Sequence, residues 1–332
     1  MKTTSIIFPK ANTVELWEEE VGELKDDEVI IKTSKSLISI GTETVILKGN
    51  YTDQEKSEWA RFPFHAGYSN VGVIYKTGKN IKGFREGDRV ITGGIHSTYV
   101  KAPAKDLLLV PADVSDEEAT FGILGRICLA GIRLSKIELG DNIVVYGLGL
   151  IGQIAMQLSR INGGVPLIGV ELSDFRSKVA KQLGCDYVFN PKNTDVAAEI
   201  MKITENRGAD IIFETTGAPK VFPETFKAAK RQGKIILMSS PHGSVQVDLQ
   251  TDLHTRGLNI IGAHTSNVPS FEEPSNRWTE YNNRKLFLQL ISKKMINVKG
   301  LITDRYKYTD AGSVYKKLLE NRDNTLGIIL EW

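Results

Sequence analysis

The chain has 332 residues, of which 42 are lysine or arginine and 40 are aspartate or glutamate. A net charge of +2 gives no general attraction to nucleic acid or to an anionic membrane, so neither is an expected partner. Two cysteines exclude a disulfide scaffold and a four-cysteine zinc site. No apolar stretch approaches the roughly 20 residues of a transmembrane helix, and the N-terminal segment lacks the apolar run of a signal peptide. We therefore expect a soluble, cytoplasmic protein.

The first part of the chain is predicted to be rich in β-structure. Short apolar runs at 29–31, 71–75 and 89–91 are separated by glycines and charged turns. Short strands with frequent turns indicate a β-rich domain, for which a barrel is one arrangement.

Strand and helix alternate from about residue 115 onward, where the sequence Ser-Asp-Glu-Glu is a capping box that predicts the start of a helix. The strands expected after it are 142–146, 166–171, 187–189, 210–214, 234–239 and 258–262. The helices expected between them are 150–161, 176–183, 196–207 and 221–231. These repeated units predict an α/β fold with a parallel, doubly wound sheet. The C-terminal segment is expected to add helices at 283–294 and 313–321 and a strand at 326–330.

The strongest motif is the sequence Val-Val-Tyr-Gly-Leu-Gly-Leu-Ile-Gly that ends at Gly152. It is a GxGxxG motif placed directly after an expected strand and before an expected helix. Gly147 permits a tight turn, Gly149 lets the backbone approach a pyrophosphate, and Gly152 lets the helix pack closely on the strand. Leu150 and Ile151 begin the helix whose N-terminus would bind the phosphates. The alternative is a glycine turn that binds no ligand.

An acidic residue at the end of the next expected strand indicates which dinucleotide this loop would bind. Glu171 lies 19 residues after Gly152, where a carboxylate can accept a hydrogen bond from the ribose 2′-hydroxyl. Because a carboxylate would repel a 2′-phosphate, NAD is favoured over NADP as the cofactor. Arg176 follows five residues later, and it could either stack on the adenine or be a solvated helix charge.

In order and spacing, further segments resemble the medium-chain dehydrogenase/reductase superfamily, and the resemblance covers nearly the whole chain. The matching segments are 40–43, 63–72, 83–90, 98–100, 109–118, 147–152 and 208–217. The resemblance implies a GroES-like catalytic domain at 1–117, a Rossmann NAD-binding domain at 118–265 and a C-terminal return to the catalytic domain at 266–332. It also implies a homodimer or homotetramer. The further cofactor-binding residues that it implies are Thr216, Gly217, Ser239 and Ala263.

The motifs that hold zinc in the alcohol dehydrogenases of this superfamily are altered in this sequence. The CGTD-like motif reads Ile-Gly-Thr-Glu at 40–43, the GHE motif reads Gly-Tyr-Ser at 67–69, and 121–126 contains no third ligand. The lobe with four structural cysteines is also missing from the sequence. Because zinc needs three or four such ligands, we predict a zinc-independent member without a metal site. The alternative is zinc held by improvised ligands such as Glu43, His65 or His96.

Without zinc, side chains must hydrogen-bond or accept the proton of an alcohol. The resemblance places Thr42 where zinc relatives have the hydroxyl residue that bonds the substrate oxygen, and Glu43 at the acidic position of the same motif, as a possible base. Tyr68 occupies the vacated histidine position, and His96 lies in the loop that borders the substrate cleft in relatives. The alternative roles are structural: a turn threonine, a glutamate paired with a cation, a tyrosine that fills space and a surface histidine.

Three further residues are candidates for substrate binding. Arg126 could bind an anionic or polyhydroxylated substrate or form a salt bridge. His264 follows the last Rossmann strand and could face the substrate or be structural. Trp278 could be an apolar platform for a sugar face or could pack in a core or interface.

The sequence thus predicts a zinc-independent, NAD-dependent dehydrogenase for a small molecule with a secondary hydroxyl group, such as a sugar or polyol. One alternative is an alkene or quinone reductase of the same superfamily, although those relatives usually bind NADP. The other is a non-catalytic NAD(H)-binding sensor that has lost catalysis together with zinc.

Overall fold

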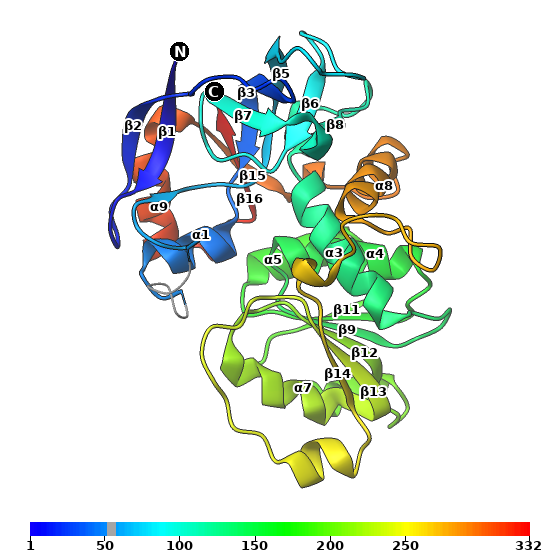
Figure 1. Cartoon of the computed structure of the whole chain (residues 1–332). Helices are drawn as coiled ribbons and strands as arrows, with labels where there is room; N and C mark the ends of the chain where they lie inside the picture. Colours follow the sequence, from blue (N-terminus) through cyan, green and yellow to red (C-terminus); the bar gives the residue numbers. More distant parts are fainter. Residues whose placement is uncertain (52–57) are drawn as a thin grey trace. The chain divides into compact units, whose positions relative to one another are not determined.

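The computed structural model describes residues 1–51 and 58–332, and the chain divides into two compact units (Figure 1). Unit 1 comprises Met1–Ile123, Arg284–Lys294 and Val298–Trp332, and unit 2 comprises Leu124–Asn283 and Met295–Asn297. Unit 2 therefore extends beyond residue 265, where the sequence analysis ends the Rossmann domain. Asn283 is tied to this unit because Arg133 of helix α3 (Gly122–Ser135) donates a hydrogen bond from Nε to Asn283 Oδ1 (2.9 Å).

Two β-sheets form the framework of unit 1. In the smaller sheet, β1 (Lys2–Phe8) pairs antiparallel with both β2 (Glu15–Glu20) and β4 (Phe64–His65). The larger sheet has the order β15-β16-β3-β5-β6-β8, and β7 also pairs with β3. Its strands are β3 (Glu28–Leu37), β5 (Asn70–Thr77), β6 (Arg89–Thr92), β7 (Tyr99–Pro103), β8 (Leu108–Leu109), β15 (Ile302–Lys307) and β16 (Gly327–Glu331). The C-terminal strand β16 thus pairs with a strand from the first forty residues.

Helices α1 (Ile40–Leu47) and α9 (Ala311–Glu320) pack together in unit 1, although they come from opposite ends of the chain (Figure 1). The fully buried ring of Tyr315 meets the ring of Phe8 edge to face, with the centroids 5.0 Å apart. Edge-to-face packing of this kind stabilises a core beyond the burial of apolar area alone. Helix α9 therefore belongs to the same core as the N-terminal strand.

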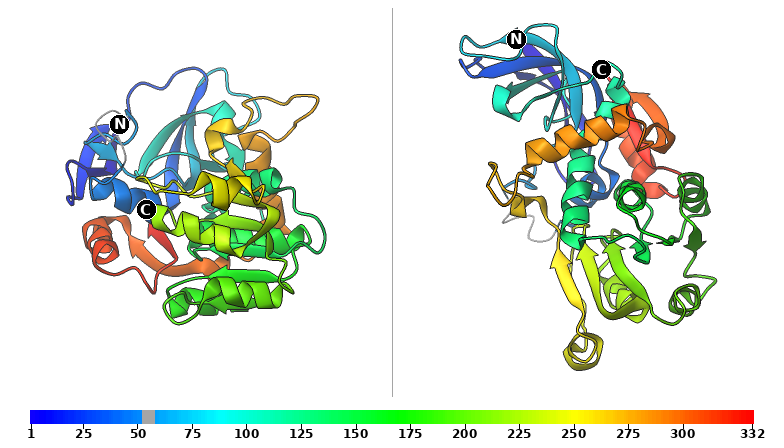
Figure 2. Two further views of the ribbon diagram at one scale, coloured as in Figure 1. Left: turned by 90° about the horizontal axis from the view of Figure 1, so that it is seen from below. Right: turned by 90° about the vertical axis from the view of Figure 1, so that its right-hand side faces the viewer.

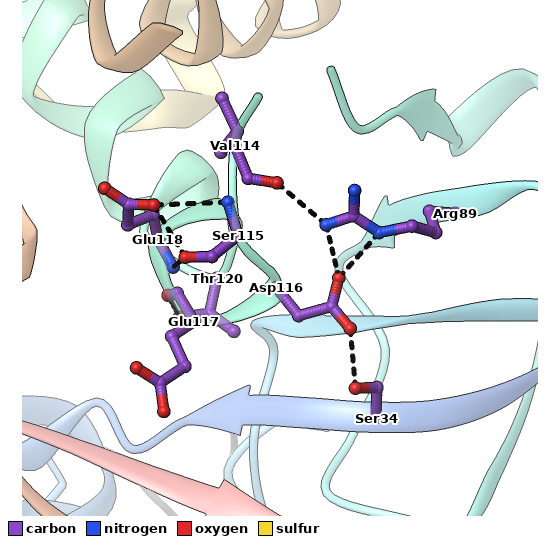
Figure 3. Close-up of polar contacts among 8 residues, drawn as sticks. All are labelled: Ser34, Arg89, Val114, Ser115, Asp116, Glu117, Glu118 and Thr120. Carbon is purple, nitrogen blue, oxygen red and sulfur yellow. Dashed lines mark hydrogen bonds and ion pairs between the residues drawn. The ribbon is translucent and has the colours of Figure 1, made fainter. Parts of the chain in front are cut away.

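Helix α2 (Asp116–Ala119) is fastened to the sheet by the residues at its start (Figure 3). The expected capping box is confirmed, because the Glu118 N–H donates to Ser115 Oγ (3.3 Å) and the Ser115 N–H donates to Glu118 Oε2 (3.1 Å). Arg89 donates to Asp116 Oδ1 through Nε (2.9 Å) and Nη2 (2.6 Å), and Ser34 Oγ donates to Oδ2 (2.6 Å). The carboxylate thus joins the helix N-terminus to two strands.

Unit 2 is built on the parallel, doubly wound sheet that the sequence predicts. Its order is β11-β10-β9-β12-β13-β14, every pair is parallel, and helices lie on both faces (Figures 1 and 2). The strands are β9 (Ile143–Tyr146), β10 (Leu167–Val170), β11 (Tyr187–Phe189), β12 (Ala209–Glu214), β13 (Ala229–Leu237) and β14 (Asn259–Gly262). The main helices are α4 (Leu150–Ile161), α5 (Asp174–Gln182), α6 (Val196–Ile203) and α7 (Phe222–Ala228). Helix α8 (Glu280–Ser292) follows the sheet.

Two predicted helix ends in unit 2 are wrong, and the first of these helices, expected at 196–207, ends at Ile203. The helix expected at 221–231 ends at Ala228, and the next three residues already belong to β13. Ala229 pairs with Ala209 across a bulge, and the Lys230 ammonium forms an ion pair with the Asp210 carboxylate. These contacts with β12 hold the segment extended where its local pattern favours a helix. Among the described residues, no helix is both long and apolar enough to cross a membrane.

Candidate functional site

The glycine-rich loop of unit 2 joins β9 to α4, and two of its glycines are required by the packing of the chain itself. Gly147 has φ +86°, and an added Cβ would lie 2.9 Å from Thr216 Cγ2. At Gly152 an added Cβ would lie 1.9 Å from the carbonyl oxygen of Gly147, closer than any real contact. These two positions therefore accept only glycine in this geometry.

Gly149 differs, because its φ is −70° and an added Cβ would meet nothing within 4 Å. The chain's own packing does not require a glycine there, so the absent side chain leaves open space at the start of α4. The first hydrogen bond of the helix runs from Gln153 N–H to the Gly149 carbonyl (2.9 Å). The N–H groups of Leu150, Ile151 and Gly152 have no carbonyl partner within the helix. Open space over these donors suits a pyrophosphate, as the sequence analysis expects.

Glu171 follows β10 and braces the same loop. The carboxylate is 8% exposed and accepts hydrogen bonds from the N–H groups of Leu148 (2.7 Å), Leu172 (2.9 Å) and Ser173 (3.0 Å). Since a carboxylate has about four acceptor positions, one remains for a ribose hydroxyl. Ribose binding by Glu171 stays a prediction, and in the structure its carboxylate also supports the backbone of the loop through the Leu148 N–H. Arg176 lies half-buried in the first turn of α5.

A second buried carboxylate, Glu214, joins two of the predicted cofactor-binding residues. It ends β12, is 2% exposed, and accepts from the Thr216 N–H (2.8 Å), the Thr216 hydroxyl and the Ser239 hydroxyl (2.5 Å). Gly217 follows with φ +70°, and the Ala263 N–H donates to the Leu237 carbonyl (2.9 Å). Glu214 is absent from the predicted site residues, although it has the pattern that identifies Glu171, an acidic residue at the carboxyl end of a strand.

In unit 1, three hydroxyl groups meet at the start of α1. The Tyr68 Oη atom lies 3.3 Å from Thr42 Oγ1 and is hydrogen-bonded to Ser39 Oγ. Thr42 and Tyr68 are half-buried, and Ser39 is 8% exposed. The structure therefore brings together two of the predicted catalytic residues. We call these three residues the hydroxyl cluster. Ser39 is missed by the sequence analysis, although it directly precedes the 40–43 motif.

Glu43 and His96 are each 0% exposed, so neither side chain has surface that a substrate could touch. Glu43 accepts from the Ser39 N–H (2.7 Å) and from the Tyr315 hydroxyl, and His96 Nε2 lies 3.3 Å from Glu43 Oε2. Burial, together with the Glu43 carboxylate, raises the pKa of Tyr315 well above its ordinary value, so the phenol stays protonated and donates. The expectation that Glu43 or His96 acts directly on a substrate is therefore corrected: both are buried beneath the hydroxyl cluster.

Two of the three predicted substrate-binding residues already have partners within unit 2. Arg126 forms an ion pair with Glu280, which is the salt bridge that the sequence analysis leaves open as its alternative. The guanidinium carbon of Arg133 lies 3.3 Å from the centroid of the Trp278 ring, and that of Arg277 lies 4.6 Å away. Trp278 is predicted to offer an open ring face to a sugar. This expectation is wrong for the ring face on which the Arg133 guanidinium lies.

His264 follows β14 and is exposed. Its Nδ1 atom accepts a hydrogen bond from the Ser266 N–H (3.2 Å), so the ring hydrogen of the neutral form lies on Nε2. This geometry leaves Nε2 available to a ligand, and substrate binding by His264 stays a prediction.

Side chains suited to a metal site are not clustered in the described parts of the chain. Within residues 1–51 and 58–332, no group of three or more His, Cys, Asp or Glu side chains could hold a metal ion. The two cysteines are buried as free thiols, and burial raises the pKa of Cys185 to about 12.

Two family models match this chain. The alcohol dehydrogenase GroES-like domain matches residues 25–112, and the zinc-binding dehydrogenase model matches residues 151–281. Among curated relatives, L-threonine 3-dehydrogenase of Pyrococcus horikoshii is 26% identical over 89% of each chain. D-guloside 3-dehydrogenase of Escherichia coli K12 is 27% identical over 77% of this chain and 74% of its own. D-arabitol-phosphate dehydrogenase of Enterococcus avium is 24% identical over 100% of this chain and 97% of its own.

Solved structures share the fold along the whole chain. Galactitol-1-phosphate dehydrogenase of Escherichia coli has a TM-score of 0.85 at 18% identity, covering 99% of this chain and all of its own. A dehydrogenase structure from Sinorhizobium meliloti bound to NADP has a TM-score of 0.82 at 17% identity over 100% of both chains. An alcohol dehydrogenase of Escherichia coli CFT073 complexed with NADH has a TM-score of 0.83 at 20% identity, covering 100% of this chain and 99% of its own. The solved structures show the shared fold, and the two family models, which together match most of the chain, show that it belongs to the alcohol dehydrogenase-like medium-chain dehydrogenase/reductase superfamily.

Proposed function

We propose that the protein is a zinc-independent, NAD-dependent dehydrogenase that acts on a secondary hydroxyl group of a sugar, polyol or similar polar molecule. The observation that carries this proposal is the hydroxyl cluster. By the resemblance, Tyr68 stands in place of a histidine zinc ligand and Thr42 at the position of the hydroxyl residue that bonds the substrate oxygen. Ser39 directly precedes the first motif and is hydrogen-bonded to Tyr68. The relatives named as dehydrogenases of threonine, a guloside and a polyol phosphate support an oxidoreductase that acts on alcohols.

A nicotinamide cofactor is supported by the relatives bound to NADP or NADH and by the open space at Gly149. When bound, nicotinamide accepts a hydride in oxidation and returns one in reduction. We propose NAD because the Glu171 carboxylate, which accepts a hydrogen bond from the Leu148 N–H of the loop, would repel a 2′-phosphate. Thr216 and Ser239, held by Glu214, are proposed to line the same cofactor site.

The hydroxyl cluster is proposed to transfer the proton between the substrate oxygen and water. Thr42 and Tyr68 are half-buried, so their oxygens can hydrogen-bond the substrate oxygen while the Tyr68 hydroxyl stays ordered by Ser39. In oxidation, the cluster would relay the hydroxyl proton of the substrate to water as the substrate carbon gives up its hydride. In reduction, the same groups return a proton to the carbonyl oxygen. No charged base that touches the substrate is required.

The test is a screen of sugars and polyols with NAD at alkaline pH, before and after removal of metals with a chelator. We expect turnover with at least one polyol that survives chelation and falls about 10²-fold in Tyr68→Phe and Thr42→Val. Tyr75→Phe is the matched control, because this tyrosine is exposed on β5 of the same unit.

Three outcomes would contradict the proposal. Activity that is lost on chelation and restored by zinc would show a metal-dependent enzyme. Tight NADH binding without turnover of any alcohol would support the sensor. Reduction of alkenes or quinones with NADPH in preference to oxidation of alcohols would support the reductase.

A further inference from the structure

His96 is buried between the segments that carry the hydroxyl cluster. On one side, its Nε2 atom faces Glu43 Oε2 at 3.3 Å, and Glu43 holds the Ser39 N–H at 2.7 Å. On the other side, the backbone N–H of His96 donates to the carbonyl of Ala66 (2.7 Å), two residues before Tyr68. One residue therefore contacts both the Ser39–Thr42 segment and the Tyr68 segment.

The imidazole ring also sets the backbone from which Tyr68 projects. Gly67 has φ +92°, and an added Cβ would lie 2.5 Å from His96 Cγ and 2.7 Å from His96 Cδ2. The ring therefore occupies the space that any other side chain at residue 67 would need. The absence of a side chain at Gly67 therefore leaves room for the His96 ring, and the contact between them fixes the backbone conformation just before Tyr68.

Hydrogen bonds from two further residues reach the ring through Ser36. The Trp332 indole N–H can only donate, and it donates to Ser36 Oγ (2.8 Å). The Ser36 Oγ atom also lies 2.8 Å from His96 Nδ1 and is hydrogen-bonded to it. The Nε2 atom lies 3.3 Å from Glu43 Oε2 but makes no hydrogen bond within the described residues. The ring is thus hydrogen-bonded at Nδ1 and packed against Glu43 at Nε2.

We propose that His96 is a positioning residue that holds Tyr68 against Ser39 and Thr42. This inference rests on the proposed function of the hydroxyl cluster, but it assigns to His96 no contact with substrate. His96 acts through Glu43 on the Ser39 side and through Gly67 on the Tyr68 side. Because a displacement of about 1 Å at a reacting group can lower a rate about 10²-fold, loss of this support is expected to lower kcat rather than cofactor binding.

A spectroscopic test reports on Tyr68 without requiring turnover. The full-length protein is labelled with 3-fluorotyrosine, and the Tyr68 resonance in the ¹⁹F spectrum is identified by its loss in Tyr68→Phe. His96→Phe keeps a ring of similar shape but removes both nitrogens, so we expect the Tyr68 resonance to shift or broaden. His96→Gln keeps a polar side chain that can hydrogen-bond Ser36, so we expect a spectrum closer to that of the unsubstituted protein. His254→Phe, an exposed histidine of unit 2, is the control and is expected to leave this resonance unchanged.

Kinetics of the same variants complete the test. We expect kcat to fall about 10²-fold in His96→Phe, with partial recovery in His96→Gln and NADH affinity within twofold of the unsubstituted protein. If His96→Phe does not fold, Ser36→Ala removes the partner of Nδ1 and is expected to shift the Tyr68 resonance. An unchanged Tyr68 resonance in the folded variant overturns the positioning role. A protein that turns over no alcohol overturns the proposed function, while the ¹⁹F comparison still decides the role of His96.

Discussion

The Tyr315 hydroxyl donates a hydrogen bond to the Glu43 carboxylate, although the two residues lie 272 positions apart in the sequence. Both side chains are fully buried, and Glu43 also holds the backbone of Ser39 at the start of α1. A buried carboxylate is costly unless donors surround it. Helix α9, near the C-terminus, therefore supplies a donor on which the N-terminal hydroxyl cluster depends.

Tyr315→Phe is expected to destabilise the protein by about 1.5–3 kcal/mol, because it leaves a buried carboxylate without one of its donors. The measurement is chemical denaturation followed through the transition of unit 1. Tyr308→Phe is the matched control: that ring stacks on Trp332 at 4.6 Å, and the substitution keeps the ring. Equal stability of the two variants would contradict the role given to the Tyr315 hydroxyl.

Two substitutions in the glycine-rich loop are expected to separate its role in cofactor binding from its role in the packing of the chain. Gly149→Ala places a methyl group in open space at a φ of −70°, so we expect unchanged stability but roughly tenfold weaker NADH binding, equal to about 1.4 kcal/mol. Gly152→Ala drives a methyl group into the Gly147 carbonyl, so we expect a loss of about 1–3 kcal/mol of stability.

Fluorescence titration with NADH and thermal unfolding would measure the two effects of the loop glycines. Gly312→Ala in α9 is the control, since an added Cβ there also meets nothing within 4 Å. Unchanged NADH affinity in Gly149→Ala would argue against a pyrophosphate above this residue.

The preference for NAD is tested at Glu171. Glu171→Gln keeps an oxygen that can accept the Leu148 N–H but removes the negative charge. We expect the ratio of NADPH to NADH affinity to rise by about fivefold or more, since repulsion near 4 Å contributes about 1 kcal/mol or more. The measurement is the dissociation constant of each reduced cofactor. A ratio equal to that of the unsubstituted protein would show that the Glu171 charge does not select the cofactor.

Patterns that are local in the sequence predict much of unit 2. The GxGxxG spacing places Gly147, Gly149 and Gly152 correctly because each is fixed by a strand–turn–helix geometry within a few residues. The same reasoning fails at Ala229, where pairing with β12 overrides a helical pattern. Propensity describes a segment alone and carries no information about the strand beside it.

The hydroxyl cluster shows the same limit of sequence reasoning. The sequence predicts Thr42 and Tyr68 because each stands at a motif position, whereas Ser39 lies outside the motifs. Sequence reasoning does not reveal that Glu43 and His96 are fully buried, because their partners involve the other end of the chain: Tyr315 donates to Glu43, and Trp332 donates to Ser36, the partner of His96. Which of several polar residues faces a ligand is decided by such distant contacts.

The ion pair between Glu117 and Arg305 predicts how stability depends on pH. Arg305 donates to Glu117 through Nε (2.7 Å) and Nη2 (2.8 Å), and this hydrogen bonding holds the pKa of Glu117 below its ordinary value of 4.5. Because the folded state lowers this pKa, the stabilisation is fully present above pH 4.5 and is lost as the pH falls through the folded-state value. Since both side chains are partly exposed, the contribution of the ion pair to the free energy of unfolding is expected to be about 0.2–1 kcal/mol.

Glu117→Gln should therefore lower stability at pH 7 and make the remaining stability less sensitive to acid, measured by urea unfolding at several pH values. Glu86→Gln, at an exposed turn, is the control, and an equal effect of the two substitutions would show that the pair contributes nothing.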